Sequence, residues 1–250
     1  MVKILYKKSY QLSSLKPIKY DPLWGKRGIF TTIRFIRKKS KFILLSKHLK
    51  NINSSLKKIN INFKISEGMI LKLLKPSLNK INNQDNLLRI AINSNIISLS
   101  IRPRLKPNKR FVGKLFNYQR SIPQLKNLYY KKIIKLLNSI NSQKQEIILC
   151  NRGALLEGCT TNIVCIRNKK IYIPVRNYYK GVTISYLLNL TKRKIKKTNI
   201  LVNDMHKYEE ILLIGSGKGV VRLSLIPEIN WKSKSDLVYK EFEHLYKKLL

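Results

Sequence analysis

The chain has 250 residues, of which 52 are basic and 12 are acidic, giving a formal net charge of +40 at pH 7. Its hydrophobic content of 44% is close to the globular average, so one large domain or two modest ones can bury a core. The three cysteines, Cys150, Cys159 and Cys165, have neither CxxC spacing nor a histidine cluster beside them. This excludes a disulfide framework, predicts no metal site and fits a reducing compartment.

The positive charge is spread along the whole chain rather than gathered on one arm. Lysine, asparagine and isoleucine are enriched together, and all three have A/T-rich codons. Drift in an A/T-rich genome explains all three residues, whereas a nucleic-acid interface explains lysine alone. The composition therefore favours a source in the cytoplasm of a reduced, A/T-rich bacterium or in an organelle such as a plastid or mitochondrion. An RNA- or ribosome-bound role stays an alternative.

The sequence predicts neither a secretory signal peptide nor a transmembrane helix. Residues 1–15 contain no continuous apolar core and therefore do not resemble a secretory signal peptide. The sequence also lacks the run of about 18 apolar residues that a transmembrane helix requires. We expect no membrane partner.

The first half of the chain alternates strand and helix patterns. Residues 28–36 are β-branched and aromatic, which predicts a strand, and Ser46 is a candidate N-cap for a helix that runs to about Ile59. The other expected elements are a returning strand at 42–45, a helix opening at Ser66 and a strand pair over 88–101. The basic stretch 102–113, with Pro103, Pro107 and Gly113, is the best linker candidate, so we expect domains at 1–112 and 113–250.

The second half reads as strands with interspersed helices. Apolar spacing predicts a helix over 124–140 with Lys126 in its first turn. The other expected elements are strands at 146–150, 161–166, 171–174, 200–202, 211–214 and 220–226, and helices at 183–190 and from Ser235 onward.

Three short motifs and two glycine turns carry the functional signal. The motifs are Gly-Ile-Phe-Thr-Thr-Ile-Arg at 28–34, Gln-Leu-Lys-Asn-Leu-Tyr-Tyr at 124–130 and Leu-Glu-Gly-Cys-Thr-Thr-Asn at 156–162. The turns are Gly-Val-Thr at 181–183 and Gly-Ser-Gly at 215–217. In this order the chain resembles the class IV (fold-type IV) pyridoxal phosphate enzymes, which include aminotransferases and 4-amino-4-deoxychorismate lyases. The resemblance runs from about residue 20 to 228.

The resemblance assigns the cofactor ring to a lysine and a carboxylate. It makes Lys126 the Schiff-base lysine, whose amine must be unprotonated near neutral pH, and Tyr130 a hydrogen-bond partner of the ring oxygen. It makes Glu157 the partner of the pyridine nitrogen, where a carboxylate keeps the ring an electron sink. Asn162 ends the family's Glu-x-x-x-x-Asn pattern. A solvated lysine, a core tyrosine and a surface acid are the alternative interpretations.

The resemblance assigns the cofactor phosphate to the two turns. Val182 and Thr183 open a predicted helix, and free N–H groups at a helix N-terminus favour phosphate. Ser216 and Gly217 would form the second phosphate contact, and Arg34 matches the arginine that reaches the same group. The stretch 215–218 is not a P-loop, because Leu212 stands where its first glycine is needed and Gly219 follows Lys218.

The Phe-Thr-Thr-x-Arg and Glu-x-Cys patterns and the short chain point to a lyase of folate biosynthesis. Such an enzyme converts 4-amino-4-deoxychorismate to 4-aminobenzoate and pyruvate. Either Thr31 or Thr32 would contact the substrate, and Arg102 or Arg104 would hold a substrate carboxylate. A class IV aminotransferase acting on branched-chain or D-amino acids is the alternative, and an inactive RNA-binding homologue is a further one.

The family also implies a fold of mixed α+β and α/β character. We expect a small N-terminal α+β domain, a larger C-terminal domain with a barrel-like β core, the cofactor between them, and a homodimer. The three histidines, His48, His206 and His244, lie far from the motifs in sequence, and we interpret them as surface or capping residues.

Overall fold

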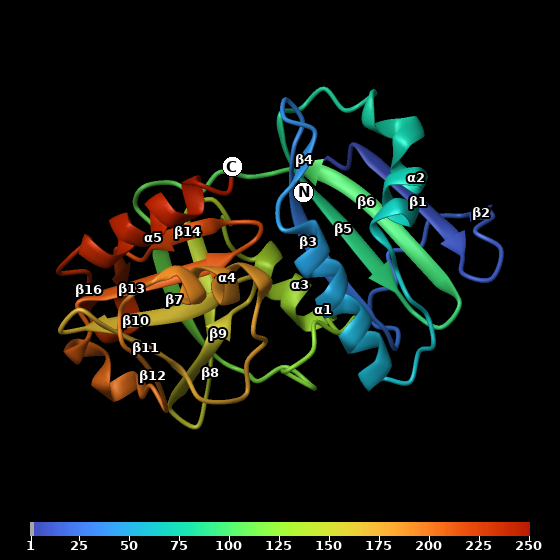
Figure 1. Cartoon of the computed structure of the whole chain (residues 1–250). Helices are drawn as coiled ribbons and strands as arrows, with labels where there is room; N and C mark the ends of the chain where they lie inside the picture. Colours follow the sequence, from blue (N-terminus) through green and yellow to red (C-terminus); the bar gives the residue numbers. More distant parts are fainter. Residues whose placement is uncertain (1–2) are drawn as a thin grey trace. The chain divides into compact units, whose positions relative to one another are not determined.

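A computed structural model describes residues 3–250 and shows two compact units (Figure 1). The first unit ends at Arg104 and also takes in Leu125–Lys132, while the second comprises Leu105–Gln124 and Ile133–Leu250. We expected the boundary after residue 112. Residues just after Arg104 bond within the second unit: the Asn108 amide donates to the Gln143 carbonyl at 2.8 Å, and Phe111 is fully buried there.

The first unit is a six-stranded antiparallel sheet with two helices on one face. The strand order is β2-β1-β6-β5-β3-β4. The elements are β1 (Tyr6–Gln11), β2 (Pro17–Ile18), β3 (Ile29–Ile36), β4 (Lys41–Phe42), α1 (Leu45–Lys58), α2 (Glu67–Leu78), β5 (Asp85–Ile92) and β6 (Ile96–Pro103).

Apolar side chains that alternate along the strands decide which face of this sheet the two helices cover. In β3 the side chains of Ile29 and Ile33 enter one apolar cluster with Leu49 of α1 and Ile70 of α2. The other face of β3 carries the intervening residues of the Phe-Thr-Thr-Ile-Arg motif. Burial of the apolar face fixes the register, because a slip of one residue would expose it.

Of the two helices of the first unit, α2 begins as we expected and α1 does not. Ser66 caps α2 as predicted, its hydroxyl accepting from the Met69 amide at 3.2 Å. Ser46 does not cap α1: the helix begins one residue earlier, and Leu44 occupies the cap position in a left-handed conformation. The short β4 leaves no room for the longer strand that we expected at 42–45.

The second unit contains two five-stranded sheets around a shared core. Their orders are β16-β15-β7-β8-β9 and β12-β11-β10-β13-β14. Apolar residues of both sheets, among them Ile148 and Leu213, form one cluster, which gives the curled, barrel-like core. The strands are β7 (Val112–Asn117), β8 (Gln145–Asn151), β9 (Ala154–Gly158), β10 (Asn162–Arg167), β11 (Lys170–Pro174), β12 (Ile195–Thr198), β13 (Glu210–Gly215), β14 (Gly219–Arg222), β15 (Leu225–Ile226) and β16 (Trp231–Lys232).

The remaining helices are short. They are α3 (Lys131–Asn138), α4 (Val182–Leu190) and α5 (Leu237–Lys247), with 3-10 turns at Val202–Lys207 and Pro227–Ile229. Helix α3 begins at the end of the segment that belongs to the first unit, and α5 follows the last strand. The predicted helix over 124–140 is therefore wrong in its first half, since α3 begins at Lys131. The strand expected at 200–202 is reduced to a single bridge between Ala154 and Leu201. Strand β12, which is rich in lysine, was not predicted.

Within residues 3–250, no helix combines the length and hydrophobicity needed to cross a bilayer. The same residues contain no group of three or more His, Cys, Asp and Glu side chains arranged to hold a metal ion.

Candidate active site

Lys126 lies on a short extended segment at the edge of the first unit's sheet. The Phe30 amide donates to the Lys126 carbonyl at 2.8 Å, and the Leu128 amide donates to the Gly28 carbonyl at 2.9 Å. Asn127 forms an antiparallel bridge with Ile29. These bonds replace the helical turn that we expected around Lys126. They fix the lysine beside the start of β3, with its Nζ 5.1 Å from the centre of the Phe30 ring.

The two threonines of the motif face opposite sides of the sheet. Thr31 is 3% exposed and bonds to Nδ1 of His48 at 2.8 Å, on the side that carries α1. Thr32 shares the other face with Phe30, because side chains alternate along a strand. The Lys126 amine lies 5.1 Å from the centre of the Phe30 ring, and Phe30 shares the face of Thr32.

His48 is a buried histidine, and the expectation of a surface or capping role was wrong. Its side chain is almost fully buried in α1 against β3. Burial and the nearby charge of Lys126 lower the pKa of His48 to about 3. The imidazole is therefore neutral at physiological pH and serves as the hydrogen-bond partner of Thr31.

Arg34 lies at the far end of β3 and is held by a carboxylate. Its Nε and one terminal nitrogen bond the two oxygens of Asp85 at 2.8 and 2.7 Å. Arg104 donates to the same carboxylate at 3.1 Å. Two guanidiniums thus share one acid, so the pair keeps a net positive charge on this side of the sheet. A guanidinium has five N–H donors in a planar fork, and two of those of Arg34 bind the two oxygens of Asp85 side by side.

Tyr130 belongs to an aromatic cluster beside the lysine. Its ring stacks on Trp24 at 5.7 Å and meets Phe30 edge-on at 5.0 Å. Arg89, which pairs with Thr32 across the sheet, places its guanidinium 3.6 Å from the centre of the Trp24 ring. The Nε of Arg89 is buried without a hydrogen-bond partner in the described chain, and burial lowers the pKa of Arg89 to about 10. The sequence motifs did not predict Arg89 as a site residue.

In the second unit, Glu157 is a buried carboxylate with two partners. Nε of Arg120 donates to Oε1 at 2.7 Å, and the Tyr179 amide donates to Oε2 at 3.1 Å. Both side chains of the ion pair are less than a tenth exposed. A guanidinium and a backbone N–H therefore stabilise the negative charge of Glu157. The scarcity of acids predicted a special role for this residue but gave no sign of Arg120.

Asn162 fixes the loop that leads into α4. Its Oδ1 accepts from the Gly181 amide at 3.0 Å, and its Nδ2 donates to the Tyr179 carbonyl. A Cβ on Gly181 would lie 2.5 Å from the Asn162 oxygen, so this close approach requires glycine. Glu157 of β9 and Asn162 of β10 thus bind the same loop from consecutive strands that belong to different sheets.

The two predicted phosphate turns lie side by side. The Thr183 hydroxyl, in the first turn of α4, is 2.9 Å from the Ser216 hydroxyl in the turn between β13 and β14. No side chain caps this helix, and its first turn carries no acid. The first turn of α4 and the Thr183 and Ser216 hydroxyls therefore lie together, and N–H groups at a helix N-terminus favour phosphate.

The Lys218 side chain is directed into the protein. Its Nζ donates to the Ser142 carbonyl at 2.8 Å and lies 3.8 Å from Oε2 of Glu146, which is fully buried. The same oxygen accepts from Thr160 at 2.6 Å. Lys218 therefore supports the turn at 158–161, which agrees with our rejection of a P-loop.

Comparison with known proteins identifies the family. The family model for Amino-transferase class IV matches residues 28–226, which is most of the chain. The chain belongs to the class IV aminotransferase family. Over 94% of its length it is 24% identical to the aminodeoxychorismate lyase of Bacillus subtilis (strain 168), covering 89% of that protein.

Solved structures confirm the fold-type IV architecture. The branched-chain amino acid aminotransferase of Escherichia coli superposes with a TM-score of 0.78 at 13% identity, covering 97% of this chain and 94% of the other. An aminotransferase of Brucella abortus bound to the cofactor PLP gives a TM-score of 0.75 at 16% identity, covering 98% and 99%. At these identities the likeness establishes the fold.

Proposed function

We propose that this chain is a pyridoxal phosphate-dependent lyase that converts 4-amino-4-deoxychorismate to 4-aminobenzoate and pyruvate. The observation that carries the proposal is the bonding of the Lys126 segment to β3. It brings the lysine amine to 5.1 Å from the centre of the ring of Phe30, which belongs to the Phe-Thr-Thr-Ile-Arg motif. The near full-length relationship to a lyase of that specificity supports the choice of substrate.

The proposed cofactor contacts are those that the family resemblance assigns. The first turn of α4 and the Ser216 turn would hold the phosphate, Glu157 would face the ring nitrogen, and Lys126 would bind the aldehyde carbon. When bound, pyridoxal phosphate supplies an electron sink for the bond broken in the substrate. The Arg120 contact supports this proposed role, because it orients the Glu157 carboxylate.

The residues of the first unit would perform the proton chemistry. The Lys126 amine would take the proton from the amine-bearing ring carbon of the substrate, after which pyruvate leaves and the ring becomes aromatic. Thr32 is the better candidate to donate a hydrogen bond to the substrate, because the Thr31 hydroxyl already bonds to His48. Arg89 would receive a substrate carboxylate, since its buried Nε has a donor to offer.

Two measurements on the purified protein test this proposal. Borohydride treatment in the presence of pyridoxal phosphate should add the cofactor to the peptide that contains Lys126, as read by mass spectrometry. Lys126→Ala should lose the adduct, and Lys135→Ala, a change at an exposed lysine of α3, should retain it. Release of pyruvate and 4-aminobenzoate from 4-amino-4-deoxychorismate then identifies the reaction.

The other outcomes separate the alternatives. An adduct without pyruvate release, together with amino transfer from branched-chain or D-amino acids to 2-oxoglutarate, would favour the aminotransferase. The fold shared with the Escherichia coli enzyme supports that second candidate. Absence of any adduct would contradict both enzyme functions. Steeply salt-dependent RNA binding would then favour the basic homologue.

A further inference from the structure

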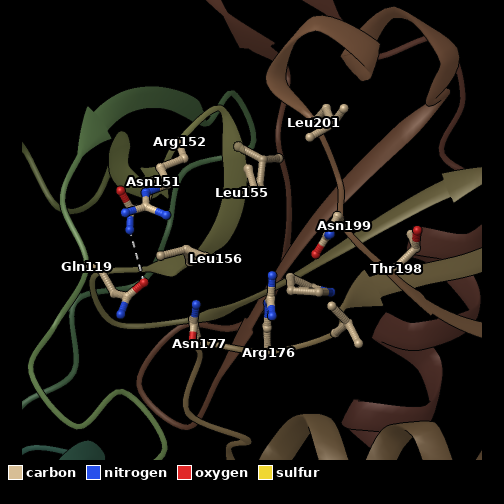
Figure 2. A pocket seen from close by; sticks show the side chains of 13 residues that line it. Gln119, Asn151, Arg152, Leu155, Leu156, Arg176, Asn177, Thr198, Asn199 and Leu201 are labelled. Atoms are coloured by element: carbon tan, nitrogen blue, oxygen red, sulfur yellow. Dashed lines mark hydrogen bonds between the residues drawn. The ribbon is translucent and has the colours of Figure 1, made fainter.

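The second unit contains a cavity of about 480 Å³ that the proposed reaction does not use (Figure 2). It lies between the β8–β9 turn, the residues that follow β11 and those that follow β12. None of the residues assigned to the cofactor lines it. Its lining within the described chain also contains no acidic and no aromatic side chain. The volume is within the range of small-molecule sites.

Backbone bonds hold the walls of this cavity in place. The Leu155 amide donates to the Ile200 carbonyl at 2.8 Å, and the Val202 amide donates to the Gly153 carbonyl at 2.8 Å. The parallel pairing of β11 with β12 positions Pro174 and Thr198 of the lining. Paired strands and their turns therefore form part of the cavity wall.

Two guanidiniums and four carboxamides provide the polar lining. Neither Arg152 nor Arg176 makes a hydrogen bond or ion pair with any residue of the part of the chain that the structure covers, and both side chains are exposed. In Figure 2 the side chains of Arg176 and Asn199 point toward the middle of the cavity. Nδ2 of Asn151 donates to Oε1 of Gln119 at 3.2 Å. This bond occupies the acceptor of Gln119 and leaves its NH₂ to donate to a ligand.

Strand β12 adds positive charge beside the cavity. It is the edge strand of its sheet and carries the exposed Lys196 and Lys197, with Lys194 just before it. Thr198, at its end, lines the cavity. Because the cavity has no acid, this charge is not neutralised locally, and an anion near the mouth is attracted.

We propose that this cavity binds a small, non-aromatic ligand that carries two or more oxyanion groups, either carboxylates or phosphates. Each guanidinium can bind one such group through two parallel N–H donors. The carboxamides donate to the remaining oxygens. A single-stranded nucleic acid fits less well, because its bases stack on aromatic side chains and the lining has none.

The test is a calorimetric titration of the full-length protein with citrate, malonate and inorganic phosphate, with acetate as the single-charge control. The ionic strength is held constant with potassium chloride, and no pyridoxal phosphate is added. The double variant Arg152→Gln/Arg176→Gln should bind citrate at least tenfold more weakly than the wild type. The matched variant Lys57→Gln/Lys58→Gln removes the same charge from the exposed end of α1 and should bind like the wild type.

A second variant and two other readouts complete the test. Asn199→Asp keeps the size of a side chain in the cavity but adds a negative charge, and it should weaken citrate binding with both arginines present. Equal weakening in the lysine control, or no saturable binding by the wild type, would overturn the proposal. The proposal would also be overturned if the double arginine variant selectively lost binding of a thymidine oligonucleotide, which would indicate a nucleic-acid surface. Selective dissociation of an oligomer, measured by light scattering, would instead indicate contact with a second copy and would also refute it.

A stronger response to phosphate than to malonate identifies a phosphorylated ligand, and the reverse identifies a carboxylate. Because binding is measured without the cofactor, failure of the proposed lyase leaves this result unaffected.

Discussion

His48 should make the protein lose stability as the pH falls from 7 to 5. In the folded chain its pKa is lowered to about 3 by burial and by the charge of Lys126, against a usual value of 6.5. Between these two pKa values His48 is protonated in the unfolded chain and neutral in the folded chain. The free energy of unfolding therefore begins to fall near pH 6.5 and continues to fall toward pH 3. In this range the free energy of unfolding falls by about 1.4 kcal/mol for each pH unit. At pH 5 the loss from this one histidine is about 2 kcal/mol.

The assay is urea unfolding at pH 7, 6 and 5, followed by tryptophan fluorescence. The chain has two tryptophans, Trp24 in the first unit and Trp231 in the second, so a Trp231→Phe background reports on the unit that contains His48. In this background His48→Gln should show a pH-dependent loss smaller by about 2 kcal/mol, because glutamine does not titrate. His206→Gln removes an exposed histidine and should leave the loss as in the parent.

The comparison is between the pH-dependent losses of unfolding free energy in the two proteins. Any pH-independent destabilisation caused by the substitution therefore cancels. Other groups, among them Asp21 with its pKa lowered by Lys26, contribute equally to both proteins. Equal losses in the parent and in His48→Gln would refute the argument. So would an NMR titration of His48 with a midpoint near 6.5.

Two further predictions concern packing around the motifs. Arg120→Ala should destabilise the second unit by about 3–5 kcal/mol, because it leaves the carboxylate of Glu157 buried without its ion-pair partner. Urea unfolding measures this cost. A smaller cost of Arg120→Ala in a Glu157→Gln background would confirm the coupling, and additive costs would contradict it. Gly28→Ala should destabilise the first unit by about 1–3 kcal/mol, because its Cβ would overlap the Ile92 carbonyl oxygen. Gly68→Ala, in a helix with open space around it, should be neutral or stabilising by up to about 1 kcal/mol. Equal melting temperatures for the two glycine variants would contradict the packing argument.

Local sequence patterns predicted the elements whose formation depends on near neighbours. The strand at 28–36 and the hairpin at 162–174 follow from alternation and turn residues, which act over a few positions. The Ser66 cap was predicted for the same reason. The segment around Lys126 was not, because its apolar spacing is typical of a helix while its backbone bonds are made to β3, almost 100 residues earlier in the chain.

The sequence by itself determined the family, through the order of its motifs, and it identified a small set of candidate residues. Only the tertiary structure decided how these residues are supported. Strand pairing placed Thr31 against His48 and Thr32 on the opposite face, and folding brought Arg120 to Glu157 and Ser216 to Thr183. Such contacts join residues that are 17 to 37 positions apart. No local pattern encodes them, because the partner of a buried polar group is chosen by the packing of whole elements.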